Sequence, residues 1–301
     1  MAREKIAVIG AGLVGSLQSI YLANRGFEVH VFERRGDIRK VELVGGRSIN
    51  LALSNRGWKA LDGAGMGEKI RSICIPMPGR MMHSIDGELT FQPYGKDGEA
   101  IYSVPRGELN QLLLAKADEN EHVELHFDVK CKDINLRTNE IQFENALTRE
   151  RSTHQFDHII GTDGAFSAVR LRLQKTDRFN FSQTSLTHGY KELVIPPTAG
   201  GGHRIEKSAL HIWPRGEYML IALPNQDGSF TVTLFFPFEG DPSFESLDTD
   251  EKIMGFFQEQ FPDALEHMPN LIEDYHDNPT SSLVTVRCSP WHYEDKVCIM
   301  G

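Results

Sequence analysis

The stretch KIAVIGAGLVGSLQSIYLANRGFEVHVFE, residues 5–33, decides the fold of this chain. Its apolar run at residues 6–9 predicts a buried strand, which a glycine-rich turn follows at once. Apolar residues then recur at helical spacing up to Gly26, a typical helix C-cap. A second strand over residues 28–32 ends at Glu33. This order of strand, glycine turn, helix, strand and acidic residue is typical of a dinucleotide-binding unit.

Each residue of this pattern has a separate physical task. Gly10 allows the tight turn off the strand, Gly12 lets a pyrophosphate approach the backbone, and Gly15 lets the helix pack close to the sheet. The pyrophosphate would lie at the helix N-terminus, where free N–H groups favour negative charge. Glu33 follows Gly15 by 18 positions, which suits a carboxylate that accepts from a ribose hydroxyl. The alternative is a helix–strand turn that binds nothing.

Composition narrows the class of protein. A length of 301 residues suggests about two domains. The net charge of −10 makes the chain a poor candidate for nucleic-acid binding, which needs concentrated Lys and Arg. Four cysteines without a CxxC pair argue against a zinc ribbon and favour a reducing compartment. No apolar run is long enough for a transmembrane helix.

A second motif lies at residues 157–170, DHIIGTDGAFSAVR. It predicts a strand that runs into an Asp163-Gly164 turn and then a helix. An Asp-Gly pair alone is an ordinary surface turn, but with the N-terminal pattern it resembles the DG motif of the aromatic flavoprotein hydroxylases, the para-hydroxybenzoate hydroxylase class. In that family the turn serves FAD and the reduced nicotinamide cofactor together. A second GxGxxG is lacking, because the glycines at 200–202 have no strand–helix context, and this favours a hydroxylase over a two-nucleotide reductase.

Further strips are similar to the branch of this class that acts on L-kynurenine. The longest is GGRSINLALSNRG at residues 45–57, and the resemblance runs from about residue 5 to residue 301. It implies an enzyme that uses FAD, NADPH and O₂ to hydroxylate L-kynurenine at the ring 3-position, through a flavin C4a-hydroperoxide. No catalytic side chain is expected, because the flavin carries the chemistry. Two alternatives stay open: a related hydroxylase of another aromatic acid, and a non-catalytic FAD-binding protein.

The resemblance also implies substrate-binding residues. Arg80 and Tyr94 match the family's contacts to the substrate carboxylate, and an Arg fork fits a carboxylate through two parallel hydrogen bonds. Phe235 and Phe236 fall in a predicted strand, so they point to opposite faces. One of them is expected to face the aromatic substrate, and the sequence does not say which. Core packing of both is the alternative.

The FAD contacts implied by the resemblance extend beyond the glycine turn. Arg106 begins a predicted helix and is expected to pair with the flavin's phosphates or ribityl chain. The whole set of expected cofactor-binding residues is Gly10, Gly12, Val14 (by backbone), Gly15, Glu33, Arg34, Arg35, Arg47, Ala52, Arg106, Cys131 (by backbone), Asp163, Gly164 and Ala168.

The predicted fold class is α/β, with a Rossmann-type FAD-binding domain interleaved with a mixed-sheet substrate domain. The FAD-binding domain is expected over residues 1–71, 104–175 and 281–301. The substrate domain is expected over residues 72–103 and 176–280, where strand-like alternation is more frequent.

No metal site is predicted. His122 and His126 bracket a probable strand, and solvent-facing histidines are the simpler interpretation. In the family the chain continues past the position of Gly301 into a segment that contacts the flavin and then into C-terminal helices. We therefore expect the hydroxylase function of the longer family protein and not of the 301 residues alone. A cytoplasmic bacterial enzyme is expected, or one at the mitochondrial outer membrane if the source is eukaryotic.

Overall fold

The structure is a computed structural model that describes residues 3–40, 49–96 and 98–301. The chain divides into two compact units, and each unit is built from separate stretches of sequence. Unit 1 contains the described residues within Met1–Glu42, Gly107–Thr184 and Thr285–Gly301. Unit 2 contains those within Leu43–Arg106 and Ser185–Val284.

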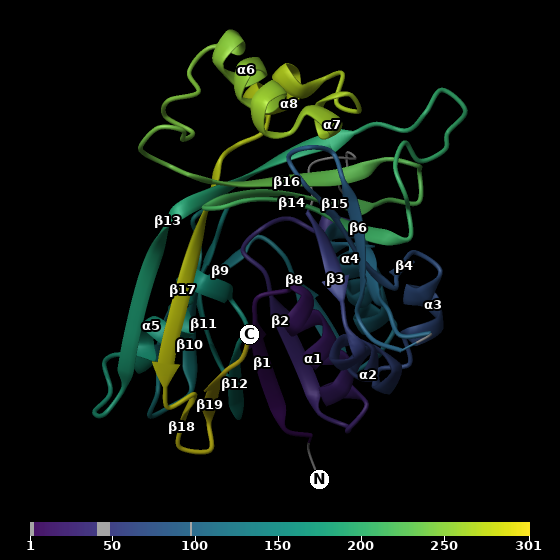
Figure 1. Cartoon of the computed structure of the whole chain (residues 1–301). Helices are drawn as coiled ribbons and strands as arrows, with labels where there is room; N and C mark the ends of the chain where they lie inside the picture. The colour runs from purple at the N-terminus through teal and green to yellow at the C-terminus, as the bar shows by residue number, and fades with distance from the viewer. Residues whose placement is uncertain (1–2, 41–48, 97) are drawn as a thin grey trace. The chain divides into compact units, whose positions relative to one another are not determined.

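Unit 1 is built on a six-stranded sheet with the order β18-β19-β12-β1-β2-β8 (Figure 1). Its strands are β1 (Lys5–Ile9), β2 (Glu28–Phe32), β8 (Val123–His126), β12 (His158–Gly161), β18 (His292–Tyr293) and β19 (Val297–Ile299). The β8, β2, β1, β12 and β19 strands are paired in parallel, while β18 runs antiparallel to β19. Both faces of such a parallel sheet must be covered.

Alternate residues of the six-stranded sheet enter two separate cores. Ile6 and Val8 of β1 pack on one face with α1 (Leu13–Ala23) and with Leu114 of α4 (Arg106–Asp118). Ala7 and Ile9 point to the other face. There they meet α5 (Ala168–Leu173) and a three-stranded sheet of β9 (Val129–Asn135), β10 (Glu140–Asn145) and β11 (Arg151–Gln155).

Unit 2 contains most of a seven-stranded mixed sheet with the order β17-β13-β16-β15-β14-β5-β6. The strands are β5 (Gly79–His83), β6 (Leu89–Pro93), β13 (Asn180–Ile195), β14 (Ala209–Arg215), β15 (Tyr218–Pro224), β16 (Phe230–Pro237) and β17 (Ser281–Ser289). The β14–β5 pair is parallel, whereas β13–β16, β16–β15, β15–β14 and β5–β6 are antiparallel. The boundary between the units falls within β13 and β17.

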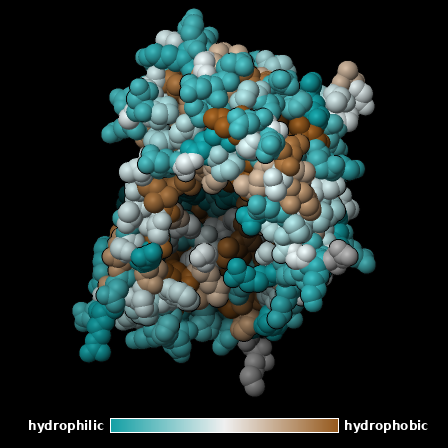
Figure 2. All heavy atoms as spheres, in the orientation of Figure 1, coloured by the Kyte–Doolittle hydropathy of each residue, from teal (hydrophilic) through white to brown (hydrophobic). Residues whose placement is uncertain are grey.

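Three helices cover one face of the seven-stranded sheet. They are α6 (Asp250–Gln260), α7 (Pro262–Leu265) and α8 (Leu271–Asp277), and they share a core with Trp213, Phe230 and Phe236. Figure 2 shows mainly hydrophilic residues on the outer surface of this helical layer. No helix in the described part of the chain has both the length and the apolar character of a membrane span.

The described residues 49–71 belong to unit 2, which corrects the predicted boundary at residue 71. The reason is strand pairing: β3 (Asn50–Leu53) and β4 (Ile75–Met77) both flank β7 (Ile101–Pro105) in a three-stranded sheet. The helices α2 (Asn55–Gly63) and α3 (Gly67–Arg71) follow β3 and pack against each other. Residues 176–184 join unit 1 instead of unit 2, and residues 281–284 join unit 2.

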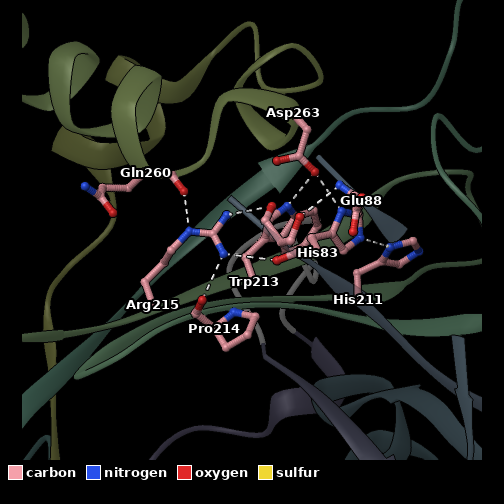
Figure 3. Close-up of polar contacts among 9 residues, drawn as sticks. His83, Glu88, His211, Trp213, Pro214, Arg215, Gln260 and Asp263 are labelled. Carbon is pink, nitrogen blue, oxygen red and sulfur yellow. Dashed lines mark hydrogen bonds and ion pairs between the residues drawn. The ribbon is translucent and has the colours of Figure 1, made fainter. Parts of the chain in front are cut away.

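A buried polar network fixes β5 against β14 and the helical layer of unit 2 (Figure 3). His83 of β5 lies with Nδ1 2.7 Å from Asp263 Oδ2 and with Nε2 2.8 Å from His211 Nδ1. Trp213 Nε1 donates to the same Asp263 oxygen at 2.8 Å. Arg215 donates to the backbone carbonyl of His83 at 3.0 Å. The network therefore holds the strand that carries Arg80.

Candidate functional site

The glycine turn in unit 1 has the backbone that the sequence pattern predicts. Gly10 has φ +102°, a conformation that favours glycine, and its N–H donates to the carbonyl of Phe32 at 2.8 Å. A Cβ on Gly15 would lie 1.9 Å from the carbonyl oxygen of Gly10, so only glycine allows this packing. A Cβ on Gly12 would meet no described atom within 4 Å. Gly12 therefore faces open space, so a ligand can come close to its backbone.

The N-terminus of α1 is left open to an anion. Gly12 is the N-cap and makes no side-chain cap, and the described first turn contains no acidic residue. The N–H groups of residues 13–15 have no partner within the helix, since the first helical bond runs from Ser16 N–H to the Gly12 carbonyl at 2.9 Å. These donors and the helix dipole fit a pyrophosphate, so the residues present suit the phosphates of FAD.

Glu33 lies directly beside the glycine turn. It is only 8% exposed, and its Oε2 accepts from the Ala11 N–H at 3.0 Å. Its Oε1 accepts from the backbone N–H and the Nε of Arg35, at 3.1 and 3.0 Å. A carboxylate has capacity for further hydrogen bonds, so a ribose hydroxyl can be added to this set.

The second motif packs directly against the first. The Thr162 N–H donates to the Ile9 carbonyl at 2.8 Å, and Thr162 Oγ1 lies 2.9 and 2.8 Å from the carbonyl oxygens of Ile9 and Gly10. A Cβ on Gly10 would also collide with the Thr162 carbonyl at 2.7 Å. Two motifs that are about 150 residues apart in sequence thus form one structure, and Thr162 is the link that the sequence did not single out.

Asp163 stabilises its own turn. Its carboxylate accepts from Ser167 Oγ and, at 2.6 Å, from the Ala168 N–H at the start of α5. Gly164, with φ +79°, gives the turn its left-handed residue. Ala168 is one of the expected cofactor-binding residues, and its N–H is already bonded to Asp163.

Asn110 of α4 also supports the glycine turn, and sequence reasoning missed it. Its Nδ2 donates to the Ala11 carbonyl at 3.1 Å, and its Oδ1 accepts from Ser16 Oγ at 3.3 Å. A polar residue among the buried Leu109, Leu113 and Leu114 was the only indication in the sequence.

The remaining expected cofactor residues of unit 1 differ in their surroundings. Val14 is 41% exposed at the start of α1, and Arg34 is exposed beside Glu33. Cys131 of β9 is buried, and burial raises the pKa of its thiol to about 12. The cofactor contact expected of Cys131 is through its backbone, so it does not involve this buried thiol. The Val129 N–H donates to the Glu33 carbonyl at 2.9 Å, which brings the start of β9 to the same edge.

Unit 2 brings Arg80 and Tyr94 together. The Arg80 guanidinium lies 5.6 Å from the centre of the Tyr94 ring, and the Tyr94 N–H donates to the Pro78 carbonyl at 3.0 Å. Arg80 is exposed and Tyr94 is half-buried. Burial raises the pKa of the Tyr94 hydroxyl, and the Arg80 charge opposes that rise. The pair presents a forked cation and a neutral hydroxyl, which suits a carboxylate.

Strand β16 separates Phe235 from Phe236. Phe236 is fully buried under α6, where its ring packs against Tyr218 and Phe256. Of the two phenylalanines between which the sequence did not decide, Phe236 is therefore the one whose ring packs in the core. Phe235 lies on the opposite, helix-free face, half-buried, with its ring 6.3 Å from that of Tyr190.

The register places Arg80 on the same helix-free face as Phe235. Three strand spacings and about four residues along the strands separate them, a distance on the order of 20 Å. The neighbours of Arg80 on this face are instead Leu210 and Ile212 of β14, with Ile221 of β15 beyond them. These three half-buried apolar side chains were missed by the sequence analysis, because only the pairing of β14 with β5 brings them to Arg80.

Ala52 and Arg106, two further expected cofactor residues, belong to unit 2. Ala52 is exposed on β3 opposite Ser103, and Arg106 is exposed where α4 begins. Burial raises the pKa of the Glu192 carboxyl, and the charge of the nearby Arg106 opposes that rise. Glu192 lies on β13 near Arg106, and the sequence analysis did not identify it as a site residue. Arg47 lies outside the described residues.

This chain is similar in sequence to known FAD-binding proteins. The FAD binding domain family matches residues 3–199. The kynurenine 3-monooxygenase of Flavobacterium johnsoniae is 52% identical over 99% of this chain and 66% of its own length. Those of Christiangramia forsetii and Dictyostelium discoideum are 46% and 49% identical over all of this chain and over 67% and 64% of their own lengths. This chain thus spans about two thirds of the length of these relatives.

Solved structures share the fold at low sequence identity. The tetrameric form of 2-methyl-3-hydroxypyridine-5-carboxylic acid oxygenase matches with a TM-score of 0.78 at 18% identity, over 100% of this chain and 75% of that one. A probable FAD-dependent monooxygenase from Pseudomonas aeruginosa matches with a TM-score of 0.75 at 15% identity, over 100% and 78%. The predicted fold class is confirmed by these similarities and by the family match.

Proposed function

Because this chain belongs to the kynurenine 3-monooxygenase family of FAD-binding proteins, we propose that the full-length protein hydroxylates L-kynurenine to 3-hydroxykynurenine. FAD, NADPH and O₂ are the proposed cofactor and co-substrates. The observation that carries the proposal is the Arg80–Tyr94 pair beside an apolar sheet surface, in a chain 52% identical to a kynurenine 3-monooxygenase.

In unit 1 the proposed task is to bind the cofactor. When bound, FAD supplies the redox chemistry that takes electrons from NADPH and activates O₂. The open N-terminus of α1 and the bare backbone of Gly12 would hold its pyrophosphate. Glu33 would accept hydrogen bonds from its ribose, since the carboxylate is buried beside Ala11.

In unit 2 the proposed task is to bind and orient the substrate. Arg80 would hold the amino-acid carboxylate through two parallel N–H donors, with the Tyr94 hydroxyl as a third donor. Leu210, Ile212 and Ile221 form an apolar surface next to this pair, which suits the carbon skeleton of an aromatic amino acid and excludes water from it.

The test is substrate-stimulated turnover by the full-length protein. We expect L-kynurenine to accelerate NADPH oxidation, and mass spectrometry to detect 3-hydroxykynurenine. Faster oxidation without this product would mean that kynurenine is only an effector and that another aromatic acid is the substrate. No response in a protein that holds FAD would contradict the hydroxylase function altogether.

A further inference from the structure

Three side chains that commonly bind metals meet at the edge of the six-stranded sheet. His30 lies on β2, and Glu124 and His126 lie on the edge strand β8. The two strands pair in parallel with His30 opposite Glu124 and Phe32 opposite His126, so the three side chains share one face. This face is the one opposite α1, because Phe32 enters the core formed with β9–β11. One ligand atom from each residue lies within 4.8 Å of the others.

The distances between these atoms match a shared ion. His30 Nδ1 is 3.3 Å from His126 Nε2 and 3.2 Å from Glu124 Oε2, and Glu124 Oε1 is 3.6 Å from His126 Nε2. Two nitrogens bound at about 2.05 Å to a tetrahedral Zn²⁺ are themselves about 3.3 Å apart. The spacing of the two histidine nitrogens therefore equals one edge of a zinc tetrahedron.

A second carboxylate orients His30. Its other ring nitrogen, Nε2, lies 3.0 Å from Glu28 Oε1, and Glu28 is paired with Lys5 Nζ at 2.9 Å. When Nε2 donates to Glu28, the lone pair of Nδ1 faces Glu124 and His126. Metal-binding histidines usually have such an outer carboxylate, which fixes the tautomer and raises the basicity of the ligand.

His126 is held in a similarly defined position. Its ring stacks on Phe32, with centroids 4.5 Å apart and planes 9° from parallel. Its Nε2 lies 3.3 Å from His30 Nδ1 and 3.6 Å from Glu124 Oε1. His122 and His126 were interpreted as solvent-facing, and their side chains are half-buried, at 19% and 27% exposed. His126 finds its partner on the neighbouring strand.

The cluster opens onto a hollow of about 330 Å³ within unit 1. His30, Glu124, His126 and His154 of β11 are among its lining residues. The hollow leaves space for a water molecule as a fourth ligand. Three protein ligands with an accessible fourth position are typical of open zinc sites.

We propose that His30, Glu124 and His126 form a binding site for one divalent transition-metal ion, with Zn²⁺ as the best fit. Two imidazoles and one carboxylate favour Zn²⁺ over Mg²⁺ or Ca²⁺, which prefer oxygen ligands. The ion joins the edge strand β8 to β2, so it stabilises this end of the sheet when bound. Glu28 is a positioning residue for His30. The site lies on the opposite sheet face from α1.

The direct test is a zinc titration of untagged, full-length protein that has been stripped with a chelator. Competition with a chromophoric chelator should show one Zn²⁺ per chain that depends on the cluster. We expect His30→Gln or His126→Gln to weaken this binding by at least about a hundredfold, and Glu28→Gln to weaken it by about tenfold to a hundredfold. The matched control is His122→Gln, which removes a half-buried histidine outside the cluster and should leave the affinity unchanged.

Co²⁺ gives a second readout that needs no variant. Co²⁺ bound by the wild-type protein should show the intense visible absorption of four-coordinate geometry, and added Zn²⁺ should abolish it. Zn²⁺ should also raise the unfolding temperature of the wild type but not of His126→Gln. The proposal is overturned by a weak six-coordinate Co²⁺ spectrum, by the lack of saturable binding, or by equal losses in His122→Gln and His126→Gln.

Discussion

The glycine turn of unit 1 and the helix-free sheet face of unit 2 are assembled in opposite ways. The turn is formed by neighbours in sequence: Gly10, Gly12 and Gly15 lie within one strand–helix junction, and Glu33 ends the next strand. The sheet face collects Arg80, Leu210 and Phe235 from three strands that lie far apart in the chain.

This difference determines what each region tolerates. The turn depends on backbone conformation and close approach, so a single methyl group at the wrong glycine disrupts it. The sheet face depends on register, because a shift of one residue in β5 would turn Arg80 into the opposite face. The buried His83–Asp263 and His83–His211 contacts hold β5 in place, whereas Thr162 and Asn110 hold the turn.

The largest expected effect separates the two faces of β16. Phe236→Ala should lower the free energy of unfolding by about 3–5 kcal/mol, because it leaves a cavity in the core under α6. Phe235→Ala should lower the free energy of unfolding much less, because the Phe235 side chain is only half-buried. Chemical denaturation of both variants measures the difference, and equal losses would show that the assignment of faces is wrong.

A fall in pH should lower the folding stability of unit 2, because His211 is buried in its neutral form. Burial lowers the pKa of His211 from 6.5 to about 4, and its neighbours His83 and Asp263 act in opposite directions. The unfolded chain therefore binds a proton that the folded state does not, and stability present above pH 6.5 is lost as the pH falls toward 4. The loss from this group is about 3 kcal/mol.

The variant His211→Gln tests this source of acid sensitivity. Its amide can replace both hydrogen bonds of the neutral ring, one from His83 and one to the Glu206 carbonyl, without titrating. Unfolding free energies between pH 7 and pH 4 should fall less steeply in the variant than in the wild type. An unchanged pH profile would mean that another group is responsible.

Two alanine substitutions should have different effects in the glycine turn. Gly15→Ala places a Cβ against the Gly10 carbonyl, so it should lower the free energy of unfolding by about 1–3 kcal/mol. The same distortion of the turn should also reduce FAD binding. Gly12→Ala points into open space, so stability should stay near that of the wild type while FAD affinity falls. Thermal unfolding and flavin content measure the two effects, and loss of stability in Gly12→Ala would contradict the open position.

The sequence analysis was most accurate for the elements and turns that a local sequence pattern determines. Strand β2 spans Glu28–Phe32 as expected, and α1 ends at Ala23, with Gly26 in the following turn at φ +90°. Asp163-Gly164 was found by its own strand–turn–helix pattern, although its contact with Gly10 through Thr162 was not.

What the sequence did not predict depends on pairing between distant segments. The boundary at residue 71 was wrong because β3 joins β7, which lies about 50 residues further on. The apolar neighbours of Arg80 required the parallel pairing of β5 with β14. His30 and His126 are 96 residues apart, so neither has a visible partner until β2 and β8 are aligned.

The most direct test measures FAD content and the KM for L-kynurenine in the same two variants of the full-length protein. Arg80→Ala should keep its FAD and raise KM by roughly tenfold to a hundredfold, the value of a charged hydrogen-bonded pair. Gly12→Ala should lose FAD, and its KM should recover when FAD is added in excess. Arg137→Ala, an exposed arginine in unit 1, serves as the control. Loss of FAD in Arg80→Ala, or an unchanged KM, would contradict the division of cofactor and substrate binding between the glycine turn and the sheet face.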